Sequence, residues 1–219
     1  MLKLGEKGAI PQKQENSYAI APHIPCGFVT PELLRRIADV SEKYDAKALK
    51  ITGATRIAIV GLKEEDIDSV WSELGLEEGA AVGLCIRSIR ACPGTDYCRL
   101  GQQDARGVGM ILDKKYHAFK LPGKFKMAVS GCKLSCSESW VRDVGLIGDK
   151  DGWILTIGGN VGTKPRIGKE LVKDLDDEAA LTAVDNVISY YQDNAKKGER
   201  LGKMIERVGL EPFKEAVGA

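Results

Sequence analysis

Four of the six cysteines in this 219-residue chain fall into two close pairs. Five residues separate Cys92 from Cys98, and three separate Cys132 from Cys136. Four thiolates are what one cubane iron–sulfur cluster requires, one on each iron. Zinc is the competing metal, but structural zinc sites usually space paired cysteines by about two to four residues, which the gap of five fits poorly. Disulfides are less favoured still, because no secretory segment accompanies the cysteines. The spacing therefore predicts a metal or cluster site.

Two further segments have residue types that could bind an anion. Phe125, Met127 and Val129 alternate with other residues as in a strand, so Lys124 and Lys126 are expected to point to the same face. The segment 157–162 reads Ile-Gly-Gly-Asn-Val-Gly, a glycine-rich turn after a predicted strand, and its backbone amides could bind carboxylates. An arbitrary lysine is usually a solvated charge, but the position of the lysine pair beside the cysteine motifs favours a role in the site.

The order of these motifs resembles that of a known family. Cys-x5-Cys, then Leu-Pro-Gly-Lys-Phe-Lys, then Gly-Cys-x3-Cys resembles the siroheme and iron–sulfur domain of the sulfite and nitrite reductases. The resemblance covers most of the chain. In length, the chain is similar to the small, single-half members of the family, the assimilatory-type sulfite reductases. It implies that the cysteines hold a [4Fe-4S] cluster and that Cys136 also bridges to the siroheme iron.

The resemblance also implies roles for individual residues. The implied cluster ligands are Cys92, Cys98, Cys132 and Cys136. The implied catalytic residues, on the distal face of the siroheme, are Arg56, Arg87, Lys124 and Lys126, with Arg90 as the close alternative to Arg87. The implied siroheme-binding residues are Cys136, Gly158, Gly159, Asn160, Lys164 and Arg166. A surface role for Lys164 and Arg166 is an equal alternative.

The activity implied by the resemblance is the six-electron reduction of sulfite to sulfide. The alternatives are a siroheme nitrite reductase, a non-catalytic siroheme or cluster protein that senses an anion or transfers electrons, and a structural zinc protein. No flavin or nicotinamide fingerprint is present, so electrons are expected from a separate carrier such as a ferredoxin. Because the chain resembles one half of most family enzymes, it is expected to be a monomer or a homodimer.

The chain departs from the family pattern at two motifs as well as in size. The second cysteine pair reads Cys-Lys-Leu-Ser-Cys, where many family members have proline and asparagine after the first cysteine. The segment after Arg56 reads Ile-Ala-Ile and lacks the glutamine that is common there. The first departure affects the loop shape around the cluster, and the second weakens the case for Arg56.

Composition describes an ordinary globular protein. Hydrophobic residues make up 43% and charged residues 29%, and the formal net charge of +1 argues against a dedicated nucleic-acid binder. No apolar run approaches the roughly 18 residues of a membrane span, so a cytoplasmic protein is expected. Cys26 and Cys85 are left over, and small buried thiols are the favoured interpretation for both.

The pattern predicts an α+β fold in two domains. Residues 1–86 would form a ferredoxin-like split βαβ unit, packed on a mixed α/β siroheme and iron–sulfur domain over 87–219 that ends in helices. In the first domain, residues 1–17 are expected to be a mobile or surface-draped arm. The predicted elements that follow it are a strand over 18–24, a helix beginning at Pro31, a hairpin over 49–59, a helix from 64 to Gly75 and a returning strand over 81–86.

In the second domain, residues 97–112 are predicted to be helical, with Cys98 in the first turn, where backbone amides would favour a thiolate. Residues 141–147 and 153–157 flank Asp-Lys-Asp-Gly and predict a hairpin. Asp176 is expected to cap a helix, and a shorter helix is expected from Arg200 to Val208, ending at Gly209.

Overall fold

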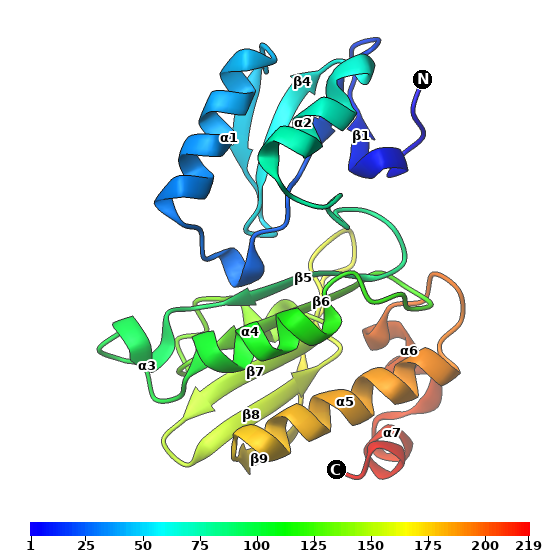
Figure 1. Cartoon of the computed structure of the whole chain (residues 1–219). Helices are drawn as coiled ribbons and strands as arrows, with labels where there is room; N and C mark the ends of the chain where they lie inside the picture. Colours follow the sequence, from blue (N-terminus) through cyan, green and yellow to red (C-terminus); the bar gives the residue numbers. More distant parts are fainter. The chain divides into compact units, whose positions relative to one another are not determined.

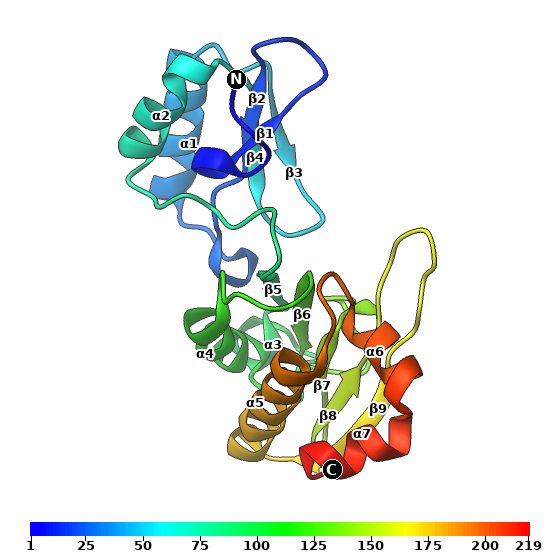
Figure 2. The same ribbon diagram turned by 90° about the vertical axis from the view of Figure 1, so that its right-hand side faces the viewer.

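The computed structural model describes all residues, Met1–Ala219, and divides them into two compact units, Met1–Gly83 and Leu84–Ala219. The first unit is a four-stranded antiparallel sheet of order β1-β2-β4-β3 with two helices on one face, as Figure 2 shows. Its elements are β1 (Ala9–Pro11), β2 (Tyr18–Ile20), α1 (Pro31–Lys43), β3 (Ala48–Ile51), β4 (Ile57–Leu62) and α2 (Ile67–Leu74), with 3-10 turns at Glu6–Gly8, Pro25–Gly27 and Glu64–Asp66. The core lies between the sheet and the two helices.

Local signals place both helices of this unit. The Thr30 hydroxyl accepts a hydrogen bond from Leu33 N, and Pro31 occupies the first turn of α1, as the sequence predicts. At the end of α2, Gly75 has φ 62°, a left-handed conformation that glycine adopts without steric cost. The two helices and the β3–β4 hairpin are therefore confirmed, and β2 ends four residues earlier than expected.

Two expectations for the first unit are wrong. Residues 81–85 form no strand apart from a single bridge between Cys85 and Lys120, and Ile86 begins a strand of the other unit. Ala9–Pro11, within the expected arm, takes the sheet edge instead, with Ala9 paired to Ile20 and fully buried. The small residues of 79–83 offer little side-chain surface for a strand to pack, whereas Ala9 fits a tightly enclosed position.

The second unit has a five-stranded sheet of order β5-β6-β7-β8-β9, with β5, β6 and β7 parallel and the last two strands antiparallel. The strands are β5 (Ile86–Ala91), β6 (Phe125–Ser130), β7 (Val144–Asp149), β8 (Gly152–Ile157) and β9 (Lys169–Leu175). The helices are α3 (Gly94–Tyr97), α4 (Ala105–Tyr116), α5 (Asp177–Asn194), α6 (Leu201–Val208) and α7 (Leu210–Val217), with a 3-10 turn at Ser139–Val141. Helices α4 and α5 cover one face of the sheet (Figure 1).

The buried residues of β6 identify the face that the helices cover. Phe125 is fully buried, and its ring lies 5.2 Å from the ring of Tyr191 in α5. Because successive side chains of a strand alternate, Met127 and Val129 share this face, while Lys126, Ala128 and Ser130 point to the other. One face of the β5–β6 pair is therefore the core under α4 and α5. On the opposite face Ala128 and Ser130 are buried as well, and Lys126 is partly exposed.

Most helix and hairpin predictions for the second unit are confirmed. The β7–β8 hairpin turns at Lys150-Asp151, Asp176 Oδ1 accepts from Ala179 N at the start of α5, and α6 ends at Gly209. The predicted helix over 97–112 is confirmed only in its second half, where residues 105–112 belong to α4. The chain forms α3, a loop, and then α4, which begins where Asp104 Oδ1 accepts from Gly107 N. Cys98 follows the end of α3, so the expected helix N-terminus is absent around its thiol.

No helix of the structure is both long enough and apolar enough to cross a bilayer.

Candidate functional site

Both cysteine pairs follow the carboxyl ends of neighbouring parallel strands. Cys92 directly follows β5, and Cys132 lies two residues beyond β6. The register pairs Ala91 with Val129, so the two strands end side by side. In open α/β sheets, this edge is where ligands bind. The parallel pairing thus brings together two motifs that lie 40 residues apart, counted from Cys92 to Cys132.

Backbone hydrogen bonds hold the two cysteine loops against each other. Gln102 N and Gln103 N both donate to Gly131 O, at 2.8 and 3.1 Å. Gly131 N in turn donates to Cys92 Sγ at 3.1 Å. A backbone amide directed at sulfur stabilises the thiolate, and such bonds tune the potential of iron–sulfur clusters.

The contact between the loops requires a glycine at position 131. A Cβ there would lie 2.8 Å from Gln103 O and 2.9 Å from Gly94 Cα, both backbone atoms. We expect Gly131→Ala to push the loops apart, to lower the free energy of unfolding by about 1–3 kcal/mol, and to reduce the iron and labile sulfide bound per chain. Gly53→Ala is the matched control, because no heavy atom lies within 4 Å of a Cβ at that position. Equal iron content in both variants would contradict this account.

The cysteines fit the implied cluster. None of the four is in a disulfide; Cys98 and Cys136 are exposed, and Cys92 and Cys132 are partly buried. No three His, Cys, Asp or Glu side chains converge in the geometry of a single metal ion. In a cubane each thiolate binds a different iron, so the four sulfurs stand apart around the cluster. Four accessible thiols on two clamped loops suit that arrangement.

Cationic side chains gather at the other end of the same strands. Lys126 is the second residue of β6, and burial lowers its pKa to about 8, with neighbouring positive charges acting in the same direction. Those neighbours are Lys124, Arg142, Arg200 and Arg87. Burial also lowers the pKa of Lys124 and of Arg87. The structure therefore brings together three of the predicted catalytic residues, Arg87, Lys124 and Lys126, with two arginines that were not predicted.

The cation cluster and the cysteines are connected along one face of the β5–β6 pair. Lys126 pairs with Ser88, and Ala128 pairs with Arg90, so these side chains share the face that α4 and α5 leave uncovered. The ladder continues beyond β5, because Cys92 N donates to Val129 O at 3.1 Å. From Lys126 to Ser130, the last residue of β6, the strand rises about 13 Å. Lysines, Arg90 and cysteines thus follow one another along this face.

Three buried donors on this side of the sheet have no hydrogen-bond partner: Ser88 Oγ, Arg90 Nε and Arg142 Nε. Buried polar groups are rarely left unpaired, and a bound ligand is one of the things that can satisfy such donors in a native chain. Siroheme carries many carboxylates, which accept hydrogen bonds from such groups. The residues present therefore fit the tetrapyrrole that the resemblance implies.

A buried carboxylate organises the cation cluster. Asp143 is 0% exposed and accepts hydrogen bonds from Arg200 Nε at 2.8 Å, Arg200 Nη2 at 2.6 Å and Lys126 N at 2.8 Å. Its carbonyl oxygen accepts from Gly158 N at 2.8 Å. Burial raises the pKa of Asp143, and the Arg200 guanidinium opposes that rise. Asp143 thus connects β6, the glycine-rich segment and the start of α6.

We expect Asp143→Asn to lower the free energy of unfolding by about 3 kcal/mol, because the change leaves Arg200 without its buried counter-charge. Urea denaturation of the cofactor-free chain measures the change. Asp151→Asn, in the exposed β7–β8 turn, is the control and should change stability by less than about 0.5 kcal/mol. A similarly small effect at both positions would refute the organising role of Asp143.

The predicted siroheme-binding segment forms a closed loop. Asn160 and Arg166 exchange two backbone hydrogen bonds, and Asn160 Nδ2 donates to Lys164 O at 2.9 Å. Gly158 has φ 80°, as a tight turn requires. Gly159 packs against the backbone of residues 140–142, beside the cation cluster. Lys164 is exposed, and Arg166 forms a bidentate ion pair with Glu206 at 2.7 and 2.8 Å, so the cofactor-binding role of this loop stays a prediction.

Arg56 lies in the first unit. It is 2% exposed, and its guanidinium donates to Ala21 O at 2.8 Å and to Ala80 O at 3.5 Å. These bonds fix the side chain within its own unit. Its predicted catalytic role stays a prediction.

The sequence reasoning missed Arg142, Asp143 and Arg200. Arg142 and Asp143 are the two charged residues of the predicted strand 141–147, and their position beside the apolar run 144–147 is a signal of function. Arg200 was read only as the start of a helix, a position that it does occupy as the residue before Leu201. Asp143 and Arg200 are 57 residues apart, so local patterns could not pair them.

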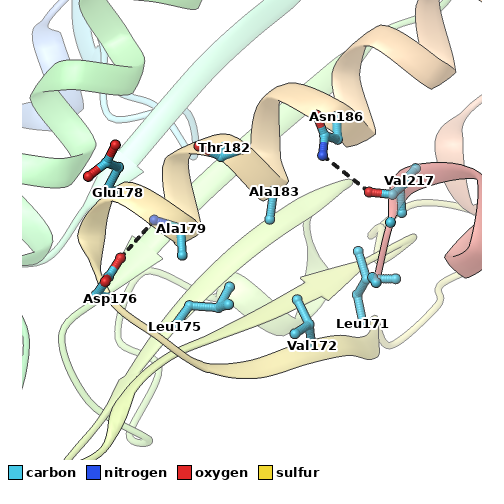
Figure 3. A pocket seen from close by; sticks show the side chains of 12 residues that line it. Leu171, Val172, Leu175, Asp176, Glu178, Ala179, Thr182, Ala183, Asn186 and Val217 are labelled. Atoms are coloured by element: carbon cyan, nitrogen blue, oxygen red, sulfur yellow. Dashed lines mark hydrogen bonds between the residues drawn. The ribbon is translucent and has the colours of Figure 1, made fainter.

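A separate groove lies between β9 and α5 (Figure 3). Leu171, Val172 and Leu175 line one side, and Ala179 and Ala183 line the other. At one end of the groove, Asn186 Nδ2 donates to Val217 O at 3.2 Å. None of the predicted site residues lines this groove.

Two family models match the two units. Residues 10–76 match the nitrite/sulfite reductase ferredoxin-like half domain, and residues 82–219 match the nitrite and sulphite reductase 4Fe-4S domain. The second match covers more than half of the chain. The fold class and the two cofactors, siroheme and a [4Fe-4S] cluster, are thereby confirmed.

Relatives in both branches of the family are similar to this chain. It is 43% identical over 211 residues to an assimilatory-type sulfite reductase of Nitratidesulfovibrio vulgaris, covering 96% of this chain and 97% of that protein. It is 38% identical over 198 residues to a nitrite reductase [NAD(P)H] of Bacillus subtilis, covering 90% of this chain but only 25% of that protein. These relatives are oxidoreductases.

Solved structures share the fold. The NirA protein of Mycobacterium tuberculosis superposes with a TM-score of 0.83 at 18% identity, over 96% of this chain and 44% of that one. A dissimilatory sulfite reductase I superposes with a TM-score of 0.82 at 16% identity, over 93% of this chain and 69% of that one. Together with the sequence matches, they show that this chain belongs to the siroheme and [4Fe-4S] sulfite and nitrite reductase family.

Proposed function

We propose that this chain is a sulfite reductase that catalyses the six-electron reduction of sulfite to sulfide, with Cys136 shared between the [4Fe-4S] cluster and siroheme. The observation that carries the proposal is the single face of the β5–β6 pair on which the cation cluster, Arg90 and Cys92 follow one another. The 43% identity to an assimilatory-type sulfite reductase, over nearly the whole of both chains, favours sulfite as the substrate.

In this proposal, Cys92, Cys98, Cys132 and Cys136 would bind the cluster, and Arg90, Arg142 and the loop 158–166 would bind the siroheme carboxylates. When bound, the coupled cofactors would supply the electrons and an iron at which the anion reacts. The chain's own cations would draw the anion in and stabilise its negative charge. Arg87 presents fixed donors, whereas Lys126, with a pKa of about 8, can give up a proton and regain it near neutral pH.

Electron delivery and assembly follow from the same proposal. We expect a separate donor protein, such as a ferredoxin, to pass electrons to the cluster. We expect the enzyme to act in the cytoplasm as a monomer or a homodimer.

Nitrite is the second candidate substrate, because the chain is 38% identical to a nitrite reductase. Both substrates are small anions that the same cations could attract. An anaerobic absorbance spectrum of the purified protein, followed by oxidation of a reduced viologen dye with sulfite or with nitrite, separates the possibilities. Siroheme bands with faster sulfite turnover support the proposal, and faster nitrite turnover overturns the substrate assignment. Siroheme bands without turnover indicate a sensing or electron-transfer protein.

A further inference from the structure

Two arginines on the face of the sheet opposite α4 and α5 share one carboxylate oxygen. Arg90 Nη1 donates to Glu138 Oε2 at 2.9 Å, and Arg142 Nη2 donates to the same oxygen. Arg90 lies in β5, and Arg142 lies just before β7. We call Arg90 and Arg142 the arginine clamp.

The clamp is incompletely satisfied by Glu138. The Arg90 and Arg142 side chains are 14% and 4% exposed, and the Nε atoms of both are buried without a partner. The buried Arg142 and the largely buried Arg90 face one carboxylate, and each guanidinium uses a single donor on it. Arg142 Nη1 donates instead to Val141 O at 3.1 Å. A guanidinium binds a carboxylate best through two parallel hydrogen bonds. The clamp therefore has both the charge and the free donors to hold a further carboxylate.

Glu138 differs from the arginines in its freedom to move. Its side chain is 55% exposed, and its backbone has φ 59° and ψ 41°, a left-handed conformation that is unusual for a residue with a side chain. The arginines are held by a strand and by burial, so an exchange of partners would move Glu138 and leave the clamp in place. Glu138 also lies two residues after Cys136, the position at which the cofactor is expected to attach.

We propose that Glu138 stands in for a siroheme carboxylate, closing the arginine clamp in the cofactor-free chain and giving it up when the cofactor binds. The inference rests on the proposed function, because it requires that the chain binds siroheme. At the clamp only hydrogen bonds change: those to Glu138 Oε2 are exchanged for hydrogen bonds to the incoming carboxylate, which the unpaired Nε donors can join. Glu138 then faces solvent, where its charge is hydrated.

If Glu138 stands in for a siroheme carboxylate, its replacement should change siroheme affinity and the melting temperature of the siroheme-free protein in opposite directions. Glu138→Gln keeps the shape of the side chain and removes the competing charge. Siroheme affinity should therefore rise about threefold to tenfold, while the melting temperature of the siroheme-free protein falls because the clamp loses its counter-charge. A purely structural Glu138 would instead lower both quantities when it is replaced.

The experiment titrates siroheme into the cluster-loaded, siroheme-free full chain and follows the absorbance bands and the melting temperature. Glu138→Ala is the second variant, and Glu170→Gln, an exposed residue of β9, is the matched control that should change neither quantity. Arg142→Gln should weaken siroheme binding about tenfold or more, because half of the clamp is lost.

Unchanged or weaker siroheme binding in both Glu138 variants would overturn the stand-in role while leaving the proposed function intact. If the unaltered chain takes up no siroheme at all, the proposed function and this inference both fail. The two failures are therefore distinguishable in one titration.

Discussion

Replacing Cys136 with serine is expected to abolish viologen-linked sulfite reduction and to uncouple siroheme from the iron–sulfur cluster. Cys136 belongs to the loop that Gly131 holds against the first cysteine loop, and its thiol is exposed rather than buried in the core. A serine hydroxyl is a poor substitute for a thiolate on iron, because iron–sulfur clusters are held by soft sulfur ligands. The loss should exceed the roughly 100-fold effect of removing a residue that only supports a metal ligand.

The measurements are the absorbance spectrum, the iron content and the dye-oxidation rate of the anaerobic variant. Cys26→Ala is the control, because Cys26 is buried in the first unit, outside the two cysteine loops. The control should keep the spectrum and the rate. A Cys136→Ser protein that reduces sulfite at the normal rate would refute the bridging assignment.

The features that the sequence predicts correctly are those with local causes. Helix α1 follows from Thr30 and Pro31, and α5 follows from the cap at Asp176, because each signal lies within a few residues of the structure that it sets. The cysteine motifs are also a local signal, since their spacing along the chain carries it, and their role as cluster ligands stays a prediction. The helix over 97–112 is the exception: the loop around Gly101 packs on the backbone of Gly94, a contact that no periodicity reveals.

The features that the sequence cannot supply are those that depend on strand order. The parallel pairing of β5 with β6 places the cysteine loops side by side and the lysines at the opposite end of the same face. Asp143 and Arg200 meet only because β7 and α6 are brought together by the fold. The patterns of β9 and α7 do not predict these elements, because only one of the seven residues of β9 is buried and α7 contains Pro212. Local chemistry predicts candidate ligands, whereas topology decides which cations accompany them.

Lys126 provides the second large effect, because its pKa of about 8 is well below the ordinary value for lysine. Its protonated fraction, and with it the rate of sulfite reduction, should fall as the pH rises through about 8. Lys126→Met should lower the rate by about 10²- to 10⁴-fold, the usual contribution of a positioned proton donor, and leave the siroheme spectrum unchanged. Lys126→Arg should keep substrate binding and lose the pH dependence near 8, because a guanidinium stays protonated.

The same pKa makes a prediction for stability in the cofactor-free chain. In the unfolded chain the pKa of Lys126 is about 10.4. Between about pH 8 and pH 10.4 the unfolded state therefore binds more protons than the folded state. The free energy of unfolding should therefore rise with pH across this window, as the cost of burying a charged lysine disappears. Urea denaturation at several pH values measures the rise, and Lys126→Met should reduce it to the part that Lys124 contributes.

Lys114→Met, on the exposed surface of α4, is the control for both measurements and should behave like the unaltered chain. The two readouts together separate a proton donor from a simple positive charge. If Lys126→Arg keeps the full rate at all pH values, Lys126 acts only through its charge, and the protons must come from another group. If the rate of the unaltered enzyme also stays constant through pH 8, the protonation state of Lys126 does not limit turnover, and its role as a proton donor is refuted.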